Sequence, residues 1–472
     1  MDSAQAKPTL IYSTHARIQM KKLRRYVLAA CILAPARARA QTPVPASPTV
    51  ALSTGGIFGK DTYSLHFQST VIDQGHYGIH SPYVGAHSFL PTNEQAVSVT
   101  ATFFAAWRPF DGMTLVMNPE LSGGQGMSGA LGIAGFPNGE TYRIGNPQPV
   151  VKTARLYVQQ VIGLEGGSER VEDGLNQVAG AVPDHRLTLI AGKFGLMDWF
   201  DNNAYSHDPR SQFMNWALAN SSAWDYPADT FGYTWGFIAE YHAPEWALRA
   251  GAAAEPKAAN QVDMDRRLAQ AHGLSLEAER QIRLGARKGT ARFLIFDNEA
   301  RMGNYDQAVA LGRRLGATPD VTQTGDYAHH KFGFTSSDDL ELRDNLGGFM
   351  RLSWDDGKNE TWAYDEVDGS LAVGVDWVPA RWGRPNDHWG TAEVVNVLSG
   401  PHRRYLAAGG LGFMLGDGAL HYGPEAITET YYRVQYKDWL QVSPDAQLVF
   451  NPGYNRARGP VPVWGLRVHI QF

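Results

Sequence analysis

The chain ends in a segment whose side chains alternate between apolar and polar, Trp464-Gly465-Leu466-Arg467-Val468-His469-Ile470-Gln471-Phe472. Successive side chains of a β-strand point to opposite faces of the sheet, so this segment is predicted to be a strand with one apolar and one polar face. It stops on an aromatic residue, Phe472. An alternating strand that ends in this way resembles the signal that outer-membrane insertion machinery reads.

The same period of two recurs at intervals along the chain. It is clearest in residues 65–71, 97–107, 233–241, 276–284, 371–377 and 442–450, with Arg280 on the wrong face of its segment. A soluble β-sandwich also alternates, but here the apolar face carries Trp and Tyr near strand ends, as a lipid-facing aromatic girdle does. The pattern therefore predicts an all-β protein, a transmembrane antiparallel β-barrel of the bacterial outer membrane.

Counting strands backward from Phe472 gives an even number, sixteen, as expected for a single-chain bacterial barrel. The predicted strand centres lie near residues 67, 102, 116, 157, 190, 237, 249, 280, 294, 335, 351, 374, 394, 432, 446 and 467. Turns at one end are mostly short, and connections at the other end are long, namely 73–95, 120–151, 195–230, 254–273, 301–329 and 400–426. We expect the long ones to be extracellular. Residues 165–184 break this rule, because they form a long connection on the periplasmic side. Either this connection is unusual or the strand count slips there.

Composition is compatible with one large barrel. Of 472 residues, 43% are hydrophobic and 11% aromatic, Gly occurs 50 times, and the net charge of −5 argues against nucleic-acid binding. The only cysteine is Cys31, so a disulfide framework and a cysteine-based metal site are excluded. We expect neither a metal nor another cofactor.

The first forty residues are typical of an exported protein. A basic stretch begins at Met20, a short apolar run covers 26–36, and Ala38-Arg39-Ala40 is a signal-peptidase site. We therefore expect 1–40 to be an upstream extension and signal peptide cleaved after Ala40, 41–60 a periplasmic lead-in, and 61–472 the barrel. A lipoprotein cleavage box that makes Cys31 a lipid anchor is the alternative.

Some motifs suggest catalysis, but the sequence around them does not predict the secondary structure that such sites require. Gly124-Gln125-Gly126-Met127-Ser128-Gly129 fits a dinucleotide-binding turn but has no strand–turn–helix context. Ser206-His207-Asp208 places three triad residue types side by side, although a triad requires geometry across the fold. The sequence does not predict an enzyme.

Several long segments resemble the carbohydrate-selective porins of the OprB type. They are residues 192–210 (GKFGLMDWFDNNAYSHDPR), 213–216 (FMNW), 225–229 (DYPAD), 399–405 (SGPHRRY), 409–413 (GGLGF) and 451–461 (NPGYNRARGPV). The resemblance covers nearly all of the chain after about residue 60. It implies a sixteen-stranded barrel in the outer membrane of a Gram-negative bacterium and passive diffusion of small sugars into the periplasm.

A sugar-selective channel requires polar groups for the sugar hydroxyls and aromatic faces for its C–H surfaces, and it must bind weakly enough to release the solute. The first candidate for an infolded constriction is the segment 195–230. Its candidate sugar-contacting residues are Asp198, Trp199, Asp201, Asn202, Asn203, His207, Asp208, Arg210, Asn215 and Trp216. Packing of the loop on itself is the competing interpretation for these residues.

Candidate residues of the lumen wall carry charges of both signs. They are Arg155, Glu240, Glu277, Glu279, Arg283, Arg351, Asp376, Arg433, Asp445 and Arg467. Each of them could instead form a cross-strand ion pair that maintains the shape of the barrel.

Two other functions stay open. A general or organic-anion porin would share the fold and differ in charge at the constriction. A secreted β-rich carbohydrate-binding protein would be soluble and would leave Phe472 and the lipid-type face unexplained. The partners we expect are small neutral sugars, outer-membrane lipid and, through Phe472, the barrel-insertion machinery. The identity of the sugar and the oligomeric state are not predicted.

Overall fold

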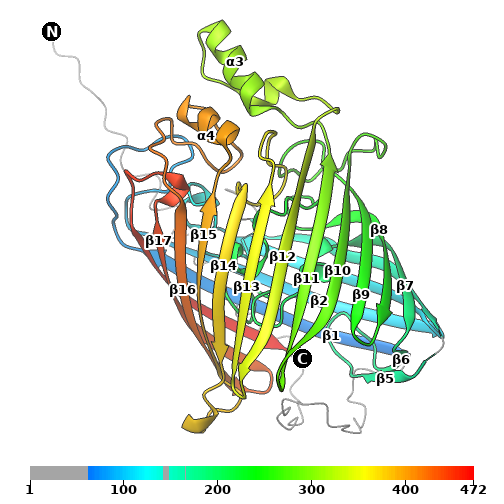
Figure 1. Cartoon of the computed structure of the whole chain (residues 1–472). Coiled ribbons are helices and arrows are strands. Elements are labelled where there is room, and N and C mark those ends of the chain that lie inside the picture. Colours follow the sequence, from blue (N-terminus) through cyan, green and yellow to red (C-terminus); the bar gives the residue numbers. More distant parts are fainter. Residues whose placement is uncertain (1–61, 142–147, 165) are drawn as a thin grey trace, which may run out of the picture. The chain divides into compact units, whose positions relative to one another are not determined.

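The computed structural model describes residues 62–141, 148–164 and 166–472. The predicted leader, the lead-in and Cys31 lie outside these residues. In the described part of the chain, sixteen strands close into one antiparallel barrel (Figure 1). They are β1 (Tyr63–His76), β2 (Glu94–Phe110), β3 (Met113–Gly124), β4 (Val150–Gly163), β7 (Arg186–Phe194), β8 (Thr234–Ala243), β9 (Trp246–Ala254), β10 (His272–Leu284), β11 (Arg287–Glu299), β12 (His330–Arg343), β13 (Leu346–Asp355), β14 (Gly369–Trp377), β15 (His388–Val397), β16 (Glu425–Lys437), β17 (Leu440–Phe450) and β18 (Val461–Gln471).

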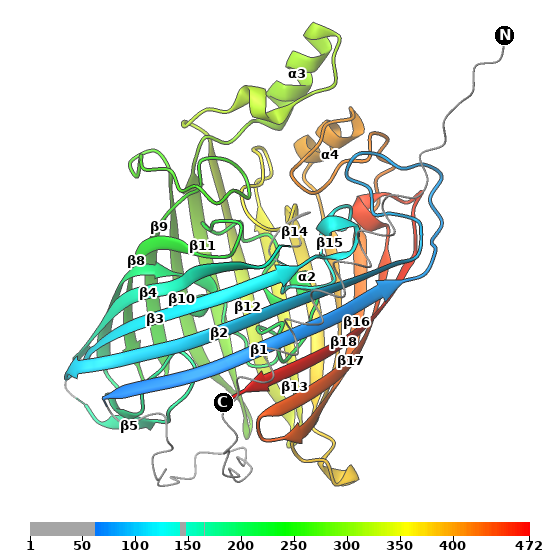
Figure 2. The same ribbon diagram turned by 180° about the vertical axis from the view of Figure 1, so that it is seen from behind.

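Each strand pairs with its neighbour in the chain, except that β7 follows β4, and β18 closes the barrel against β1. The closing register sets Val71 opposite Val468. Beyond it, Phe472 exchanges two backbone hydrogen bonds with Phe67, at 2.9 and 3.2 Å. Figure 2 shows β1 to β4 from behind, tilted across the barrel as closure requires. The predicted sixteen-stranded barrel is confirmed, and every predicted strand centre falls inside a strand.

The two ends of the barrel differ as the sequence predicts. At one end β2 and β3, β8 and β9, and β10 and β11 are joined by two residues each. The first of these turns is Asp111-Gly112, in which Gly112 has φ +77° and a Cβ atom would lie 2.3 Å from the carbonyl oxygen of Val161. Glycine is therefore required there. Two further connections at the long-loop end, 356–368 and 451–460, were not among the predicted long loops.

Short helices occur in the connections. They are η1 (Met127–Ala130), η2 (Leu196–Asp198), α2 (Trp216–Ala219), α3 (Tyr305–Leu315), η3 (Val321–Thr324), η4 (Ala380–Trp382), α4 (Gly400–Ala407) and η5 (Pro452–Tyr454). The longest, α3, begins after Asn304, whose side chain accepts a hydrogen bond from Gln307 N, and ends at the left-handed Gly316. None of the helices in the described residues is long and apolar enough to cross a membrane.

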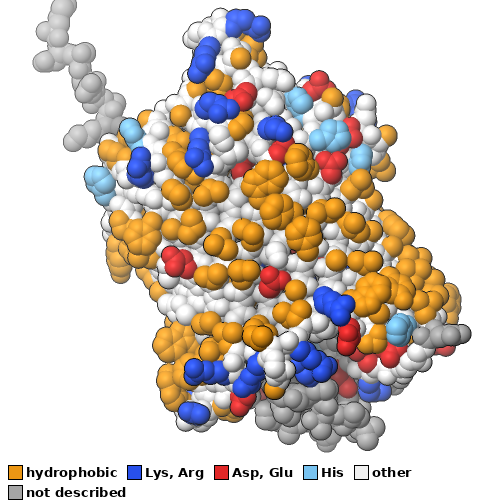
Figure 3. All heavy atoms as spheres, viewed as in Figure 1, with side chains coloured by type: hydrophobic (Ala, Val, Ile, Leu, Met, Phe, Trp, Pro, Cys, Tyr) orange, Lys and Arg blue, Asp and Glu red, His pale blue; other side chains and the backbone are white. Residues whose placement is uncertain are grey.

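The outer face of the barrel carries the apolar side chains of the alternation. Trp235 and Phe237 of β8 are 50% and 47% exposed, whereas Glu240 of the same strand is buried on the inner side. Hydrophobic side chains cover the middle of the face in Figure 3, and Lys and Arg lie toward its ends. Burial of such a band in lipid is what stabilises a barrel in the outer membrane.

The inner face is less polar than a simple alternation predicts. Phe104, Ile190, Ile238 and Ile427 point inward and are fully buried. The first three share a buried cluster with Leu196 and Phe200 of the inward-folded connections, and Ile427 shares one with Phe213 and Ala217. The wall beneath these connections is apolar because it forms a core with them.

The long periplasmic-side connection is a real feature and not an error in the strand count. Between β4 and β7, the strands β5 (Ser168–Val171) and β6 (Gly180–Pro183) form a separate two-stranded sheet. Both lie at the end of the barrel that carries the C-terminus and the short turns (Figure 1).

Candidate channel constriction

The connection between β7 and β8, residues 195–233, folds back along the inner wall of the barrel. Its middle part is almost entirely buried, including α2 and the run from Phe213 to Thr230. Asn215 caps α2 by accepting a hydrogen bond from Ala217 N at 3.0 Å. The contacts of this inward segment reach side chains of strands from β3 to β18, so its position is set by the barrel wall.

One buried network joins the inward segment to β13. The Arg351 guanidinium donates to the carbonyl oxygens of Leu218 (2.8 Å) and Asp201 (3.1 Å), and its Nε lies 3.5 Å from the Asp201 carboxylate. That carboxylate also accepts from the backbone and hydroxyl of Ser221, at 2.7 and 2.8 Å. Arg351 and Asp201 are buried, and they hold the loop in place without access to a solute.

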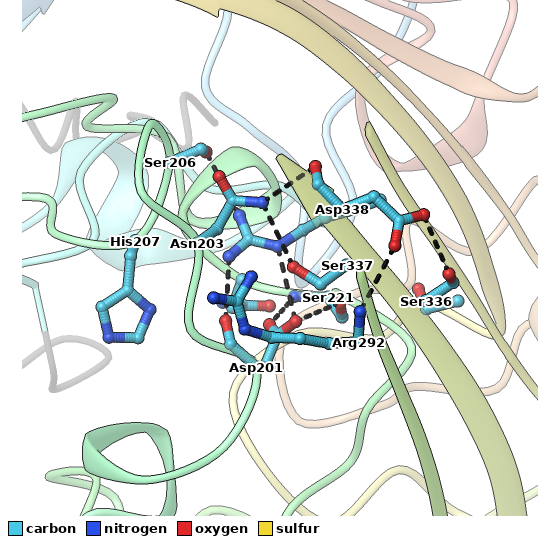
Figure 4. A network of polar contacts seen from close by, with 12 residues as sticks. Asp201, Asn203, Ser206, His207, Ser221, Arg292, Ser336, Ser337 and Asp338 are labelled. Atoms are coloured by element: carbon cyan, nitrogen blue, oxygen red, sulfur yellow. Dashed lines mark hydrogen bonds and ion pairs between the residues drawn. The ribbon is translucent and has the colours of Figure 1, made fainter. Parts of the chain in front are cut away.

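A second set of contacts attaches the segment to β12 (Figure 4). Asn203 points toward the wall and donates to Ser337 Oγ (3.3 Å) and to the Asp338 carbonyl oxygen (3.2 Å). His207 is turned away from this network in Figure 4 and is partly accessible. Asn203 is therefore a wall contact, whereas the His207 side chain takes no part in this network.

The far side of the segment is attached to the last strands. Glu429 of β16 accepts from the backbone amides of Met214 (2.6 Å) and Asn215 (2.9 Å). Arg467 of β18 donates to the carbonyl oxygens of Pro209 (2.7 Å) and Gln212 (2.6 Å). The candidate Trp216 is also enclosed, because it stacks on Phe136 with ring centroids 5.6 Å apart.

One edge of the inward segment is accessible and combines charge with an aromatic face. Arg155 of β4 donates to the two Asp198 oxygens at 2.7 and 2.5 Å, and both side chains are about one-sixth exposed, at 15% and 17%. Trp199 is next in the chain and packs edge-on against Tyr157, with ring centroids 6.0 Å apart. Asn202 is also partly accessible, and its side-chain amide lies 3.5 Å from the Trp199 carbonyl oxygen.

Arg210, which is partly accessible, forms a second cluster with two buried carboxylates. Its Nη2 lies 2.9 Å from Glu120 of β3, and its Nε lies 2.9 Å from Glu140. Lys152 of β4 completes the cluster with an ion pair to Glu120 at 3.0 Å. Nearby, burial raises the pKa of Asp208, but the Arg210 charge and hydrogen bonds from Arg210 N and the Ser211 hydroxyl bring it below its usual value. Each of these charges has an opposite charge or a hydrogen-bond donor beside it.

Charged side chains of the wall form a continuous row across five strands. Arg249 of β9 joins Glu240 to Glu277 and Glu279, and Arg292 of β11 joins Glu279 to Asp339. Glu277 also accepts from Asp201 N at 2.8 Å, so the inward segment rests on this row. The row is an example of the cross-strand pairing that was the alternative for single wall residues.

The remaining wall candidates have different surroundings. Asp376 accepts from the Tyr431 hydroxyl at 2.8 Å and lies 2.6 Å from a His388 ring nitrogen. Arg433 donates to the Ser211 carbonyl oxygen at 3.3 Å, and Asp445 accepts from Gln447 at 3.1 Å. Arg283 is exposed near the short β10–β11 turn, away from the inward segment.

Several residues of these clusters were not predicted. Arg249 alternates with the exposed Leu248 and Arg292 with the exposed Phe293, so extending the period of two to β9 and β11 would have found both. Glu140 lies in a connection without periodicity, and only its contacts in three dimensions identify it. Within the described residues, no group of three or more His, Cys, Asp or Glu side chains could hold a metal ion.

Comparisons with known proteins agree with this architecture. The family model described as "Carbohydrate-selective porin, OprB family" matches residues 96–472. The high-pH structure of Pseudomonas putida OprB is similar, with a TM-score of 0.67 at 14% identity over 87% of this chain and 94% of that one. The outer-membrane channel DcaP of Acinetobacter baumannii gives a TM-score of 0.48 at 10% identity, covering 88% of this chain and 99% of that one. A search of curated proteins returned no match.

Proposed function

Because the chain belongs to the OprB family of carbohydrate-selective porins, we propose that the accessible edge of its inward segment is where a sugar is recognised as it crosses the outer membrane. The protein is an integral outer-membrane porin, and its long connections are then extracellular. The observation that carries the proposal is the Arg155–Asp198 pair beside Trp199 on a segment fixed to the wall on several sides.

The arrangement favours a small neutral solute for electrostatic reasons. An ion that enters the constriction meets charges that are already paired, such as Arg155 with Asp198, and gains little from either member. A sugar hydroxyl can donate to a carboxylate and accept from a guanidinium of the same pair. The accessible part of the Trp199 ring offers an aromatic surface for the C–H groups of the sugar.

Passage through such a site requires no energy source. Hydroxyl contacts replace part of the hydration of the sugar, and weak binding allows the solute to leave again. The direction of flux then follows the concentration gradient. The buried candidates Asp201, Asn203, Asn215 and Trp216 position the accessible ones and do not contact the solute.

Two partners belong to the same proposal. The exposed apolar band contacts outer-membrane lipid. The C-terminal strand directs the chain to the insertion machinery, supported by the position of Phe472 at the barrel seam, where its ring stacks on Trp439 with centroids 5.6 Å apart. Export precedes this step and removes residues 1–40.

Liposome swelling with the refolded protein tests the proposal. Glucose, a neutral amino acid and an organic anion of similar size are compared. We expect glucose to enter fastest, and its advantage to fall when Trp199→Ala or Arg210→Ala is introduced. Trp382→Ala, which removes an exposed tryptophan of η4 outside the inward segment, is the matched control and should change nothing.

Equal rates of entry for all three solutes would contradict sugar selectivity and favour a general porin. Preferential entry of the anion would favour an organic-anion porin. A protein that stays soluble and never enters liposomes would contradict the membrane function.

A further inference from the structure

The connection between β4 and β7 is the longest connection at the short-turn end of the described barrel, and its tip turns inward. Residues 172–179 join β5 to β6. Val178 and Ala179 of this tip are only 4% and 7% exposed, and Val178 belongs to the same buried cluster as Phe104 and Ala106 of the inner face of β2. A surface hairpin would leave these side chains in solvent.

Two polar contacts fix the tip to the inner wall. Arg108 of β2 donates to the carbonyl oxygens of Ala179 (3.1 Å) and Val178 (3.3 Å). Asp173 lies 3.3 Å from Nε2 of His66, an inward residue of β1. Hydrogen bonds from a charged guanidinium to two successive carbonyl groups hold the backbone of the tip as well as its side chains.

These contacts place the tip across part of the mouth. The hairpin leaves the barrel from β4 and β7, yet Asp173 reaches β1, which is three strands away from β4. Strands lie about 4.8 Å apart, so the tip crosses about 14 Å of the wall. Its apolar side is buried on β2, and Glu172 is exposed.

We propose that the tip of the β5–β6 hairpin, residues 172–179, is a second narrowing of the channel, placed at its periplasmic exit, which limits the size of the neutral solute that can pass. The inference rests on the proposed porin function. The inward segment 195–233 and the tip then act in series, the first on the chemistry of the solute and the second on its size.

Polyethylene glycols of graded size, added to one side of a planar bilayer, measure each mouth separately. Polymers small enough to enter a mouth lower the single-channel conductance, and larger ones do not. Cysteine is absent from the described barrel, so Leu315→Cys on the exposed surface of α3 can be biotinylated. Streptavidin block then reports the orientation of the inserted channel.

Two variants act on the tip. In the first, the residues between Leu164 and His185, which are already joined by a backbone hydrogen bond of 2.9 Å, are replaced by an Asn-Gly turn. In the second, Val178→Asp places a charge against the apolar wall and displaces the tip. Both should admit larger polymers from the periplasmic side and raise conductance, with the extracellular cut-off unchanged.

Arg287→Ala, which removes an ion pair with Asp344 at the same rim without touching the hairpin, is the control and should behave as the parent. If both tip variants keep the periplasmic cut-off of the parent while glucose is still preferred in liposomes, this inference is wrong and the proposed function stands. If the parent itself shows no preference for glucose, the proposed function fails whatever the hairpin does.

Discussion

Arg351 illustrates how a single side chain can fix an entire connection. Its guanidinium bonds two backbone carbonyl groups and faces the Asp201 carboxylate, all buried inside the barrel. Arg351→Met keeps the volume but leaves these acceptors and the buried carboxylate without their partner. Breaking a buried ion pair costs about 3–5 kcal/mol.

We therefore expect Arg351→Met to lower the free energy of unfolding in detergent by that order and to increase the open-channel noise, because the inward segment loosens. Arg283→Met is the matched control. It removes an exposed arginine, and the free energy of unfolding should change by no more than about 0.5 kcal/mol. Equal effects of the two substitutions would contradict the role given to Arg351.

The Arg155–Asp198 pair predicts a change in ion selectivity. Arg155→Gln leaves the Asp198 carboxylate unpaired in the accessible part of the channel. The reversal potential in a salt gradient should then shift toward cation selectivity, and Asp198→Asn should shift it toward anions. The exchanged pair Arg155→Asp with Asp198→Arg should return it close to the parent value. Unchanged potentials in both single variants would place this pair away from the permeation path.

At the scale of single residues, the sequence indicated which residue types the inward segment carries, but not which of those side chains are exposed. Asp198, Trp199 and Arg155 were singled out, and the structure brings them together on an accessible edge. Asp201 and Asn215 were singled out on the same grounds and are buried. The difference depends on which side of the segment meets the wall, and a connection without periodicity carries no signal of that.

Among the elements, α3 and α4 are joined into a cap over the long-loop end (Figure 1). The ring of Tyr305 in α3 stacks on His402 in α4 at 4.2 Å. His402 also faces Asp368 (3.1 Å) and Glu366 (3.6 Å) of the neighbouring connection, and all four side chains are buried. The cap is therefore held by a charged imidazole enclosed between carboxylates.

This arrangement makes the cap sensitive to pH. Burial disfavours the charged imidazole, but Asp368 and Glu366 overcome it and raise the pKa of His402 to about 9. Burial likewise opposes the charge of Asp368, yet His402 and Lys331 lower its pKa to about 2. The stability from His402 is fully present below about pH 6.5 and is lost as the pH rises through about 9. The stability from Asp368 is present above about pH 3.9 and is lost as the pH falls through about 2.

We expect amide exchange in α3 and α4, corrected for the intrinsic rate, to be slowest near pH 5–6 and to accelerate as the pH approaches 9. His402→Gln should remove most of this dependence. A parent protein whose cap exchanges equally at pH 6 and pH 9 would show that the ion pair does not hold it.

The strands were predictable because each has one face in lipid. The helices were not predictable, because they belong to connections that pack on one another. Signals for α3 were nevertheless readable, namely the cap residue Asn304 and the terminal Gly316. The β5–β6 hairpin was noticed only as an excess of length, since four-residue strands are too short for a reliable alternation.

For the whole molecule, the seam between β1 and β18 is where the chain becomes a closed barrel. Phe472 contributes two backbone hydrogen bonds to Phe67 and a ring contact to Trp439 at this seam. Deleting Phe472 should reduce the fraction of heat-modifiable, folded protein in outer-membrane preparations and leave channels that do form with normal conductance. Replacement by Tyr should preserve assembly. An unchanged folded fraction after deletion would contradict a role for this residue in insertion.

The architecture as a whole was predictable because lipid imposes the same rule on every strand. Strand number and the asymmetry of the two ends follow from the period of two and the turns. The filled interior does not, because Ile190 and Ile427 face inward only where a connection covers them.

The hydrogen bonds from Arg467 to the carbonyl oxygens of Pro209 and Gln212 have a consequence for the order in which the barrel folds. Arg467 is buried in the closed barrel, so its guanidinium finds these acceptors only if the inward segment already lies inside when β18 pairs. Sealing of the cylinder is thereby coupled to correct threading. If the segment were misplaced, β18 would have to pair while the buried guanidinium lacked its acceptors, which disfavours closure of the barrel.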